Sequence, residues 1–591
     1  MKLQLALIKK MLSLKPISLL LVIFTSVTEV MSAFMGVYLT KLLVSLVINE
    51  VPFTELITTL SLYILGMLFV QLVYRFFMVQ LEKTSSFVRM GTFGELTNSI
   101  MTFDYQLFED ESIVSLQQQA FQCSNSDSAL FGVYPKNLQS FITVVLQIFI
   151  YAGLFLIVDL SVIWILLLMM ISLSVYRRFQ NHMFLKTKPA MDKVSEQLQV
   201  MKRTSGKFSM AKDMRIYGVK NWFKDIQEEL LLNRQKIHGK RLRIEAIGNL
   251  ISASFSVILT ALGYWILVDR VIAQSITVDE FVLLFAAITQ LTSLSSLLVD
   301  RMSVLTKNGK EFEVFQQYIN YPQPFNHHST KALPTGELSI EFDNVSFTYP
   351  NAEQPLFENL SFKINANEKC ALVGLNGSGK TTLVKLLCNL YKPDNGQILI
   401  NGIDNQSYHT LDYYQLFSAV FQDTHVWPFT IKELIIQGHP FDEKKYQEVL
   451  KLSGMDSVIE KAINKDDTLI ASSIDENAIA LSGGQMQKLK LAQALYKDGR
   501  ILILDEPTAA LDPLAEAEVY QNYFDLAKEK TSLFITHRLS STQFCDRILY
   551  LQDGQIIESG THQELMGLKG QYYDMYEKQS YYYVQQGGSN V

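Results

Sequence analysis

The chain has 591 residues, which is enough for two or three domains, and a formal net charge of −6. This weakly acidic balance argues against nucleic acid as the main partner. Hydrophobic residues make up 48% of the chain and the mean hydropathy is positive. The apolar excess is concentrated in the first half, so we expect a membrane-embedded domain there.

Six apolar stretches in the first half are long enough to cross the roughly 30 Å hydrocarbon core of a bilayer, which takes about 20 residues. A buried helix of a soluble protein is the alternative for each stretch alone, but their succession favours membrane spans. The expected spans cover residues 17–47, 55–80, 138–158, 160–176, 246–267 and 278–302.

The distribution of basic residues predicts the orientation of these spans. Lysine and arginine precede the first span and crowd residues 177–243, whereas the loops on the opposite face hold almost none. The positive-inside rule therefore predicts a cytoplasmic N-terminus and a cytoplasmic C-terminal half, in a multi-pass protein of a bacterial cell membrane. The first apolar run is too long for a cleavable signal peptide. The four scattered cysteines all map to the cytoplasmic side, where we expect reduced thiols.

Three polar residues within the expected spans are candidates for the wall of a substrate cavity. Glu29 lies near the middle of the first span, where a carboxylate is costly enough to suggest a function. It could recognise a cationic substrate or take a proton; it could equally pair with Arg75 or hydrogen-bond to a neighbouring helix. Gln290 and Ser293 belong to a polar strip on the last span, which is consistent with a cavity wall or with close helix packing.

The second half contains a phosphate-binding pattern. Residues 374–381, GLNGSGKT, fit G-x-x-x-x-G-K-[ST] between an expected buried strand and an expected helix. Glycines let the backbone amides face phosphate oxygens, and the helix N-terminus adds positive charge. Lys380 would neutralise the β- and γ-phosphates of a nucleotide, and Thr381 would ligate Mg²⁺. The candidate nucleotide-binding residues of this loop are Gly374, Asn376, Gly377, Ser378, Gly379, Lys380, Thr381 and Thr382.

Two further strands are expected to end beside this loop. Residues 501–504 are apolar and precede Asp505 and Glu506, which places two carboxylates at the carboxyl edge of a parallel sheet. Asp505 would hold Mg²⁺ through its water shell, and Glu506 would polarise the attacking water. The alternative is that both residues merely cap the strand. His537 follows another apolar strand and could contact the γ-phosphate, although a lone histidine is usually structural.

The order of these motifs resembles that of the ATP-binding cassette (ABC) superfamily. Residues 481–485, LSGGQ, are similar to its signature motif, which implies that Ser482, Gly483, Gly484 and Gln485 cap the γ-phosphate bound by an opposite subunit.

The same resemblance assigns roles to four more positions. It implies that Tyr349 stacks on adenine and that Gln422 senses Mg²⁺ and the attacking water. It also implies that Asp512 lies in the loop joining two nucleotide domains and that His537 acts as a switch histidine.

The resemblance also implies a domain plan. An all-α transmembrane domain of six helices is expected at residues 1–320, and an α/β P-loop ATPase domain with an α-helical subdomain at residues 336–580. Residues 321–335 would form a linker and residues 581–591 a tail. Two long cytoplasmic excursions separate the spans. Within them, residues 111–120 and 205–215 are candidate coupling segments to the ATPase domain, or else simply solvated helices.

ATP-driven transport by alternating access is the function that the resemblance implies, with ATP and Mg²⁺ as cofactors. Two chains in a lipid bilayer are needed to complete each ATP site, and the intact hydrolytic residues favour a homodimer over a heterodimer with a second half-transporter. The expected action is export of a peptide, a drug or a lipid-like amphiphile. The alternatives are import of a metal chelate, lipid flipping and, against the weight of the six spans, a non-transporting ATPase.

Overall fold

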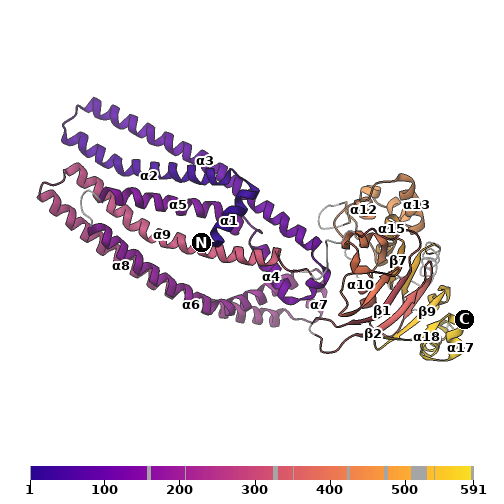
Figure 1. Ribbon diagram of the computed structural model, residues 1–591. Helices are drawn as coiled ribbons and strands as arrows, with labels where there is room; N and C mark the ends of the chain where they lie inside the picture. Colours follow the sequence, from indigo (N-terminus) through magenta and orange to yellow (C-terminus); the bar gives the residue numbers. More distant parts are fainter. Residues whose placement is uncertain are drawn as a thin grey trace. The chain divides into compact units, whose positions relative to one another are not determined.

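The computed structural model divides the chain into two compact units (Figure 1). The first comprises residues 1–101 and 115–321, and the second comprises residues 102–114 and 322–591. The described residues are 2–155, 161–206, 208–323, 331–350, 352–421, 426–470, 477–506, 527, 529–537 and 539–587.

The first unit is helical. Within the part of the chain that the structure describes, five of its helices, α2, α3, α5, α8 and α9, are long and apolar enough to cross a membrane. The expected fourth span overlaps α6, and residues 156–160, where it would meet the third, lie outside the described residues. The helices are α1 (Lys2–Leu14), α2 (Ser18–Ile48), α3 (Phe53–Thr102), α4 (Glu111–Gln122), α5 (Leu130–Phe155), α6 (Ser161–Ser205), α7 (Phe208–Ile216), α8 (Lys220–Ile272) and α9 (Val278–Ile319).

Local sequence signals set where these helices begin. Pro52 stands immediately before α3, where its fixed φ angle favours the helical start and its missing N–H is not needed. Thr277 and Glu280 form a capping box at the start of α9, in which the Thr277 amide donates to Glu280 Oε2 at 3.0 Å. Each device satisfies or removes a backbone donor that would otherwise lack a partner in the first turn.

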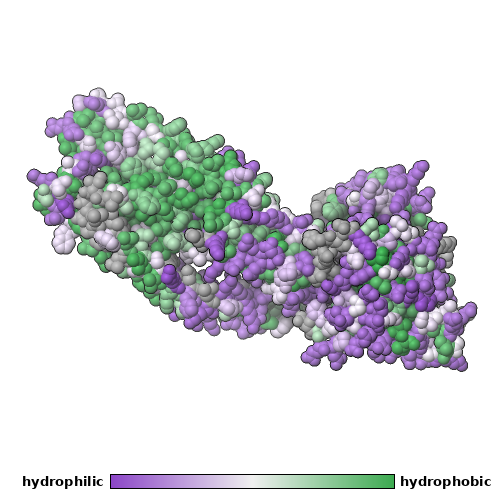
Figure 2. All heavy atoms as spheres, viewed as in Figure 1, coloured by the Kyte–Doolittle hydropathy of each residue, from purple (hydrophilic) through white to green (hydrophobic). Residues whose placement is uncertain are grey.

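The core of the first unit lies between α2, α5 and α9. Val144 and Phe155 of α5 pack with Ile288 and Leu291 of α9 in one buried cluster. The apolar segment of α3, in contrast, has no buried residue, and hydrophobic side chains cover the long helices in the space-filling view (Figure 2). An apolar surface of this extent is typical of a protein that faces lipid, so the chain is a multi-pass membrane protein.

The second unit contains two sheets. One has four strands in the order β2-β1-β4-β5, and the other has six in the order β10-β9-β3-β8-β7-β6. In the larger sheet all neighbouring pairs are parallel except β10 with β9. The strands are β1 (Ile340–Phe347), β2 (Phe357–Ile364), β3 (Lys369–Val373), β4 (Asn395–Ile400), β5 (Ile403–Asp404), β6 (Phe417–Val420), β7 (Ile501–Asp505), β8 (Thr531–Ile535), β9 (Arg547–Gln552) and β10 (Gln555–Gly560).

A main core and a smaller helical core hold this unit together. Buried residues of β1, β3, β7 and α10 form the main core, while α12, α13, α14 and α15 pack around a separate cluster that includes Leu434, Leu450 and Leu489. An α/β fold with a helical subdomain is therefore present. Its main helices are α10 (Lys380–Leu387), α11 (Thr410–Tyr413), α12 (Ile431–Ile436), α13 (Glu443–Ser453), α14 (Asp456–Glu460), α15 (Gly483–Lys497), α17 (His562–Leu568) and α18 (Gln571–Gly587).

A short segment between α3 and α4 packs against the second unit. Residues 102–114 belong to that unit, and they contain the 3₁₀ helix η1 (Tyr105–Glu109). Glu109 pairs with Lys385 of α10 at 3.3 Å, and the Tyr105 ring meets Tyr391 edge-on at 5.9 Å between centroids. Of the expected coupling segment at residues 111–120, only residues 111–114 lie in this unit. The aromatic and acidic side chains of η1 make the contacts, and no helical periodicity marks them in the sequence.

Candidate nucleotide site

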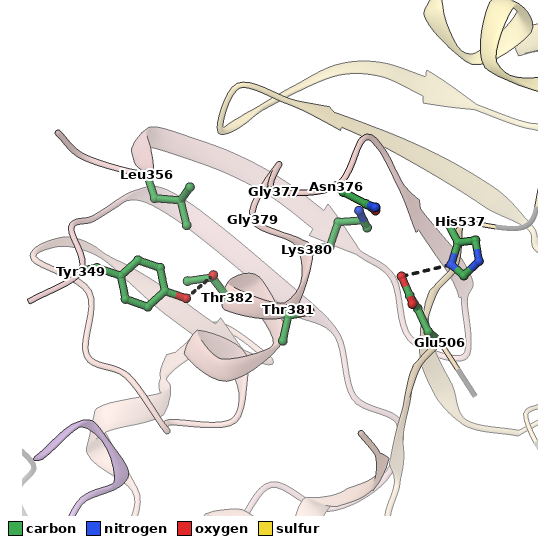
Figure 3. Close-up of a pocket in the computed structure, with 10 residues that line it drawn as sticks. All are labelled: Tyr349, Leu356, Asn376, Gly377, Gly379, Lys380, Thr381, Thr382, Glu506 and His537. Atoms are coloured by element: carbon green, nitrogen blue, oxygen red, sulfur yellow. Dashed lines mark hydrogen bonds and ion pairs between the residues drawn. The ribbon is translucent and has the colours of Figure 1, made fainter. Parts of the chain in front are cut away.

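Residues of the expected phosphate loop and Glu506, one of the two expected carboxylates, line one cavity of 540 Å³ in the second unit. Tyr349 and Thr382 lie at one end of this cavity, and Glu506 and His537 lie at the other (Figure 3). Strands β3, β7 and β8 are neighbours in the larger sheet, so the segments that follow their carboxyl ends converge here. The lining residues are Tyr349, Leu356, Asn376, Gly377, Gly379, Lys380, Thr381, Thr382, Glu506 and His537.

The phosphate loop depends on glycine at positions where the backbone leaves no room for a side chain. A Cβ on Gly374 would stand 2.2 Å from the carbonyl oxygen of Leu551. Gly379 has a φ of +103° and caps the start of α10, and its Cβ would stand 2.7 Å from the Phe357 ring. Alanine at either position would force the loop to move. The tight loop leaves backbone amides and the N-terminus of α10 facing the cavity, as an anion site requires.

Lys380 supplies the positive charge of this loop. Its amine donates to the carbonyl oxygens of Gly374 at 3.0 Å and Leu375 at 2.9 Å. Burial lowers the pKa of Lys380, and the carboxylates of Glu506 and Asp505 oppose this shift. A phosphate oxygen would favour the charged amine more strongly than neutral carbonyl groups do, so the site is electrostatically suited to a polyphosphate.

Thr381 and Asp505 form a pair of oxygen ligands suited to Mg²⁺. The Thr381 hydroxyl donates to Asp505 Oδ2 at 3.1 Å, and Asp505 is 1% exposed at the end of β7. Hydroxyl and carboxylate oxygens are hard ligands, and Mg²⁺ usually binds through one or two carboxylates together with water and substrate phosphates. The two residues therefore fit the metal that the sequence predicts, and the structure brings them together from helix α10 and strand β7, 124 positions apart in the chain.

Glu506 and His537 face one another across the end of the cavity (Figure 3). His537 Nδ1 lies 3.2 Å from Glu506 Oε1, and the two side chains are 43% and 13% exposed, respectively. Glu506 has a φ of +49°, an uncommon conformation for a residue with a side chain, and its amide donates to the Ile535 carbonyl at 3.0 Å. This backbone geometry turns the carboxylate out of the strand direction and towards the cavity.

The other end of the cavity is aromatic and apolar. The Tyr349 hydroxyl lies 2.6 Å from Thr382 Oγ1, and its ring packs edge-on against Tyr391 and Phe347. Leu356 lines the same end, and no motif in the sequence marks it beyond its position before β2. An aromatic ring beside an aliphatic side chain offers a flat apolar surface of the kind on which a base can stack.

Residues 482–485 lie at the start of α15 and outside the lining of this cavity. Ser482 and Gln485 form a capping box: Ser482 Oγ accepts from the Gln485 amide at 3.3 Å, and Gln485 Oε1 accepts from the Ser482 amide at 2.9 Å. Ser482 and Gly483 are exposed. The helix N-terminus thus presents its positive end at the surface, apart from the phosphate loop of its own chain.

Two candidate residues of the nucleotide site, Gln422 and Asp512, lie outside the described residues. The predicted segment 205–215 falls largely on α7 in the first unit.

The three candidate cavity residues of the first unit have different surroundings. Glu29 Oε2 accepts from Gln139 Nε2 at 2.6 Å and from the Thr143 hydroxyl at 3.0 Å, so the carboxylate is hydrogen-bonded to the neighbouring helix α5. Gln290 and Ser293 are exposed on α9, whereas Thr292 and Ser295 of the same strip are buried against the bundle. Some residues of the polar strip therefore pack inside the helix bundle, and others lie on the exposed face of α9.

Comparison with known proteins supports the assignment of the second unit as a nucleotide-binding domain. Residues 357–509 match the family described as ABC transporter. The chain is 30% identical over 377 residues to the subtilin transport ATP-binding protein SpaT of Bacillus subtilis, which covers 63% of this chain and 61% of that protein. It is 35% identical over 299 residues to the ATP-dependent lipid A-core flippase of Methylobacillus flagellatus, covering 48% and 49%.

The match to these curated relatives thus spans about half to three fifths of their length. A solved structure, titled as a bacterial Atm1-family ABC exporter with ATP bound, shares the fold of nearly the whole chain: the TM-score is 0.80 over 95% of this chain and 97% of that one, at 19% identity. Residues 357–509 therefore match the ABC transporter family, and the chain has the fold of an ABC exporter, with a helical membrane domain followed by an α/β ABC ATPase domain.

Proposed function

We propose that this protein is an ATP-driven exporter that works as a dimer of half-transporters. The observation that carries the proposal is the cavity lined by the phosphate loop and by the Glu506–His537 pair, with Asp505 bonded to Thr381 of its wall. Each of these groups corresponds to one requirement of phosphoryl transfer, namely charge neutralisation, metal binding and activation of water. The same chain also has a lipid-facing helical unit.

The residues of the cavity divide the work of hydrolysis. Lys380 and the loop amides would bind the β- and γ-phosphates, and Thr381 and Asp505 would hold Mg²⁺, which would supply further positive charge for the phosphate oxygens. Glu506 accepts a proton from the attacking water, because its carboxylate faces the cavity and is mostly shielded from solvent. His537 orients Glu506 and contacts the γ-phosphate. Gln422 is proposed to sense the metal and the water.

A second copy completes each site. The exposed N-terminus of α15 lies outside the cavity of its own chain, so its positive end would cap a γ-phosphate held by another subunit. ATP would thereby join two ATPase domains, and hydrolysis would release them. The intact set of hydrolytic residues favours a homodimer, and Asp512 would lie in the loop that joins the two domains.

The energy reaches the membrane domain through segments that contact the ATPase domain. Residues 102–114 supply one such segment, since Glu109 and Tyr105 contact Lys385 of the phosphate-binding helix α10, and Tyr105 also contacts Tyr391 just after it. Movement of the ATPase domains on ATP binding would then shift α3 and α4. ATP binds preferentially to the closed form, so the cycle is a shift of population between inward- and outward-facing states.

A peptide or a lipid-like amphiphile is the class of cargo that we favour, because relatives are named for subtilin transport and for flipping of lipid A-core. Gln290 and Ser293 on the exposed face of α9 are the proposed contacts of the cargo. Glu29 is satisfied by two hydrogen bonds in the structure, which favours a packing role over recognition of a cationic substrate.

The proposal is tested by ATPase measurements on the full chain in lipid nanodiscs, followed by transport into vesicles. A panel of peptides, lipids, drugs and metal chelates is compared, with the Glu506→Gln variant as the blank. Stimulation by one class that is also moved into inside-out vesicles supports export and identifies the cargo. Movement of labelled lipid alone selects the flippase alternative. An absence of ATP hydrolysis under all conditions would sink the proposal.

A further inference from the structure

The C-terminal helix α18 reaches the backbone of the proposed catalytic histidine. Gln579 Nε2 donates to the carbonyl oxygen of His537 at 2.6 Å, and Gln579 Oε1 accepts from the Leu539 amide at 3.1 Å. One side chain thus binds a backbone acceptor and a backbone donor on either side of position 538. The sequence had suggested little for this part of the chain, because a glutamine on a polar helix carries no motif.

Helix α18 is itself fixed at its N-terminus, about two turns before Gln579. Glu558 of β10 accepts from the amides of Gln571 and Tyr572 at 2.6 Å and 3.0 Å, which places a carboxylate at the helix N-terminus. The buried Tyr572 hydroxyl lies 2.7 Å from both Thr542 Oγ1 and His562 Nδ1. Thr542 belongs to the 3₁₀ helix η5 (Leu539–Phe544) that follows His537, so a second contact ties the same segment to α18.

These contacts matter because, among the described residues, the side-chain partner of the histidine ring is Glu506 alone. The His537 side chain is 43% exposed, and its ion pair with Glu506 is a single contact at 3.2 Å. The position of the ring is then set largely by its backbone, and the His537 carbonyl and the Leu539 amide are two of the groups through which that backbone is held. A displacement of about 1 Å in a catalytic group can cost up to about a hundredfold in rate.

We propose that Gln579 is a positioning residue for ATP hydrolysis, which holds the His537 backbone so that the imidazole meets Glu506 and the γ-phosphate. Through Gln579, helix α18 becomes part of the hydrolytic machinery, and any partner that moved α18 would change the rate of hydrolysis without touching the nucleotide. This inference rests on the proposed ATPase function.

The test compares Gln579→Met with Lys578→Met in the full chain in nanodiscs. Methionine matches the length of glutamine but removes both hydrogen bonds, and Lys578 is the exposed neighbour on the same helix. We expect kcat to fall about tenfold in Gln579→Met with KM for MgATP within about twofold, and no change in Lys578→Met. Equal kcat in the two variants would overturn the proposal, as would a parallel loss of kcat and of bound ATP, since that is the result of local unfolding.

A double variant separates positioning from general support of the fold. If Gln579 acts through His537, Gln579→Met has no further effect in a His537→Ala background, measured by single-turnover hydrolysis so that slow rates remain measurable. A full additional loss in that background would contradict the proposal. Failure of the proposed function itself is recognised differently, because the unaltered chain would then hydrolyse no ATP.

Discussion

Replacement of Glu506 by glutamine separates nucleotide binding from hydrolysis. Glutamine has the same shape as glutamate and keeps a polar group 3.2 Å from His537 Nδ1, but it cannot accept a proton from water. The other proposed phosphate and metal contacts belong to Lys380, Thr381 and Asp505, whose positions the substitution leaves unchanged. ATP affinity should therefore stay within about twofold, while a general base contributes about 10²–10⁴-fold to the rate.

That range corresponds to about 2.7 to about 5.4 kcal/mol of activation free energy, at about 1.36 kcal/mol for each factor of ten. The glutamate side chain is only 13% exposed, so solvent has little access to replace the lost base and we expect the upper half of the range. The assay is steady-state phosphate release in nanodiscs, with ATP occupancy measured by filter binding. A rate reduced less than about fivefold would show that another group activates the water.

Three further predictions follow from described contacts. Asp505→Asn should raise the Mg²⁺ concentration for half-maximal hydrolysis about tenfold, since outer-shell ligands commonly contribute that much; an unchanged Mg²⁺ titration would remove Asp505 from the metal site. Glu109→Gln should lower cargo-stimulated hydrolysis up to about fivefold without altering the basal rate, because the partly exposed pair with Lys385 contributes at most about 1 kcal/mol. Replacement of the exposed Glu111 by glutamine is the control. An equal effect of both substitutions would refute the role of the pair. Burial raises the pKa of Cys388 to about 12, so this thiol stays protonated at neutral pH and should resist maleimide until the protein is denatured; rapid labelling of the native chain would contradict that burial.

The contact between η1 and α10 shows how a docking segment can escape detection in a sequence. Residues 111–120 have a helical pattern and were the natural expectation, but the Tyr105 and Glu109 side chains make the contacts in the structure. A short 3₁₀ helix of this kind is too short to display periodicity in the sequence. Its side chains bind because they fit Lys385 and Tyr391, which lie almost three hundred positions away.

The sequence by itself determined the parts of this protein whose physics is local. An apolar run must be helical to satisfy its backbone in lipid, a glycine-rich loop before a helix forms a phosphate site, and an apolar strand ending in Asp505 and Glu506 places carboxylates at a sheet edge. Tertiary structure alone decided which groups meet: Thr381 with Asp505, Glu506 with His537, Glu29 with α5, and Gln579 with the backbone around position 538. Such pairings depend on strand order and helix packing, which bring together residues far apart in the chain and leave no periodic trace in either partner.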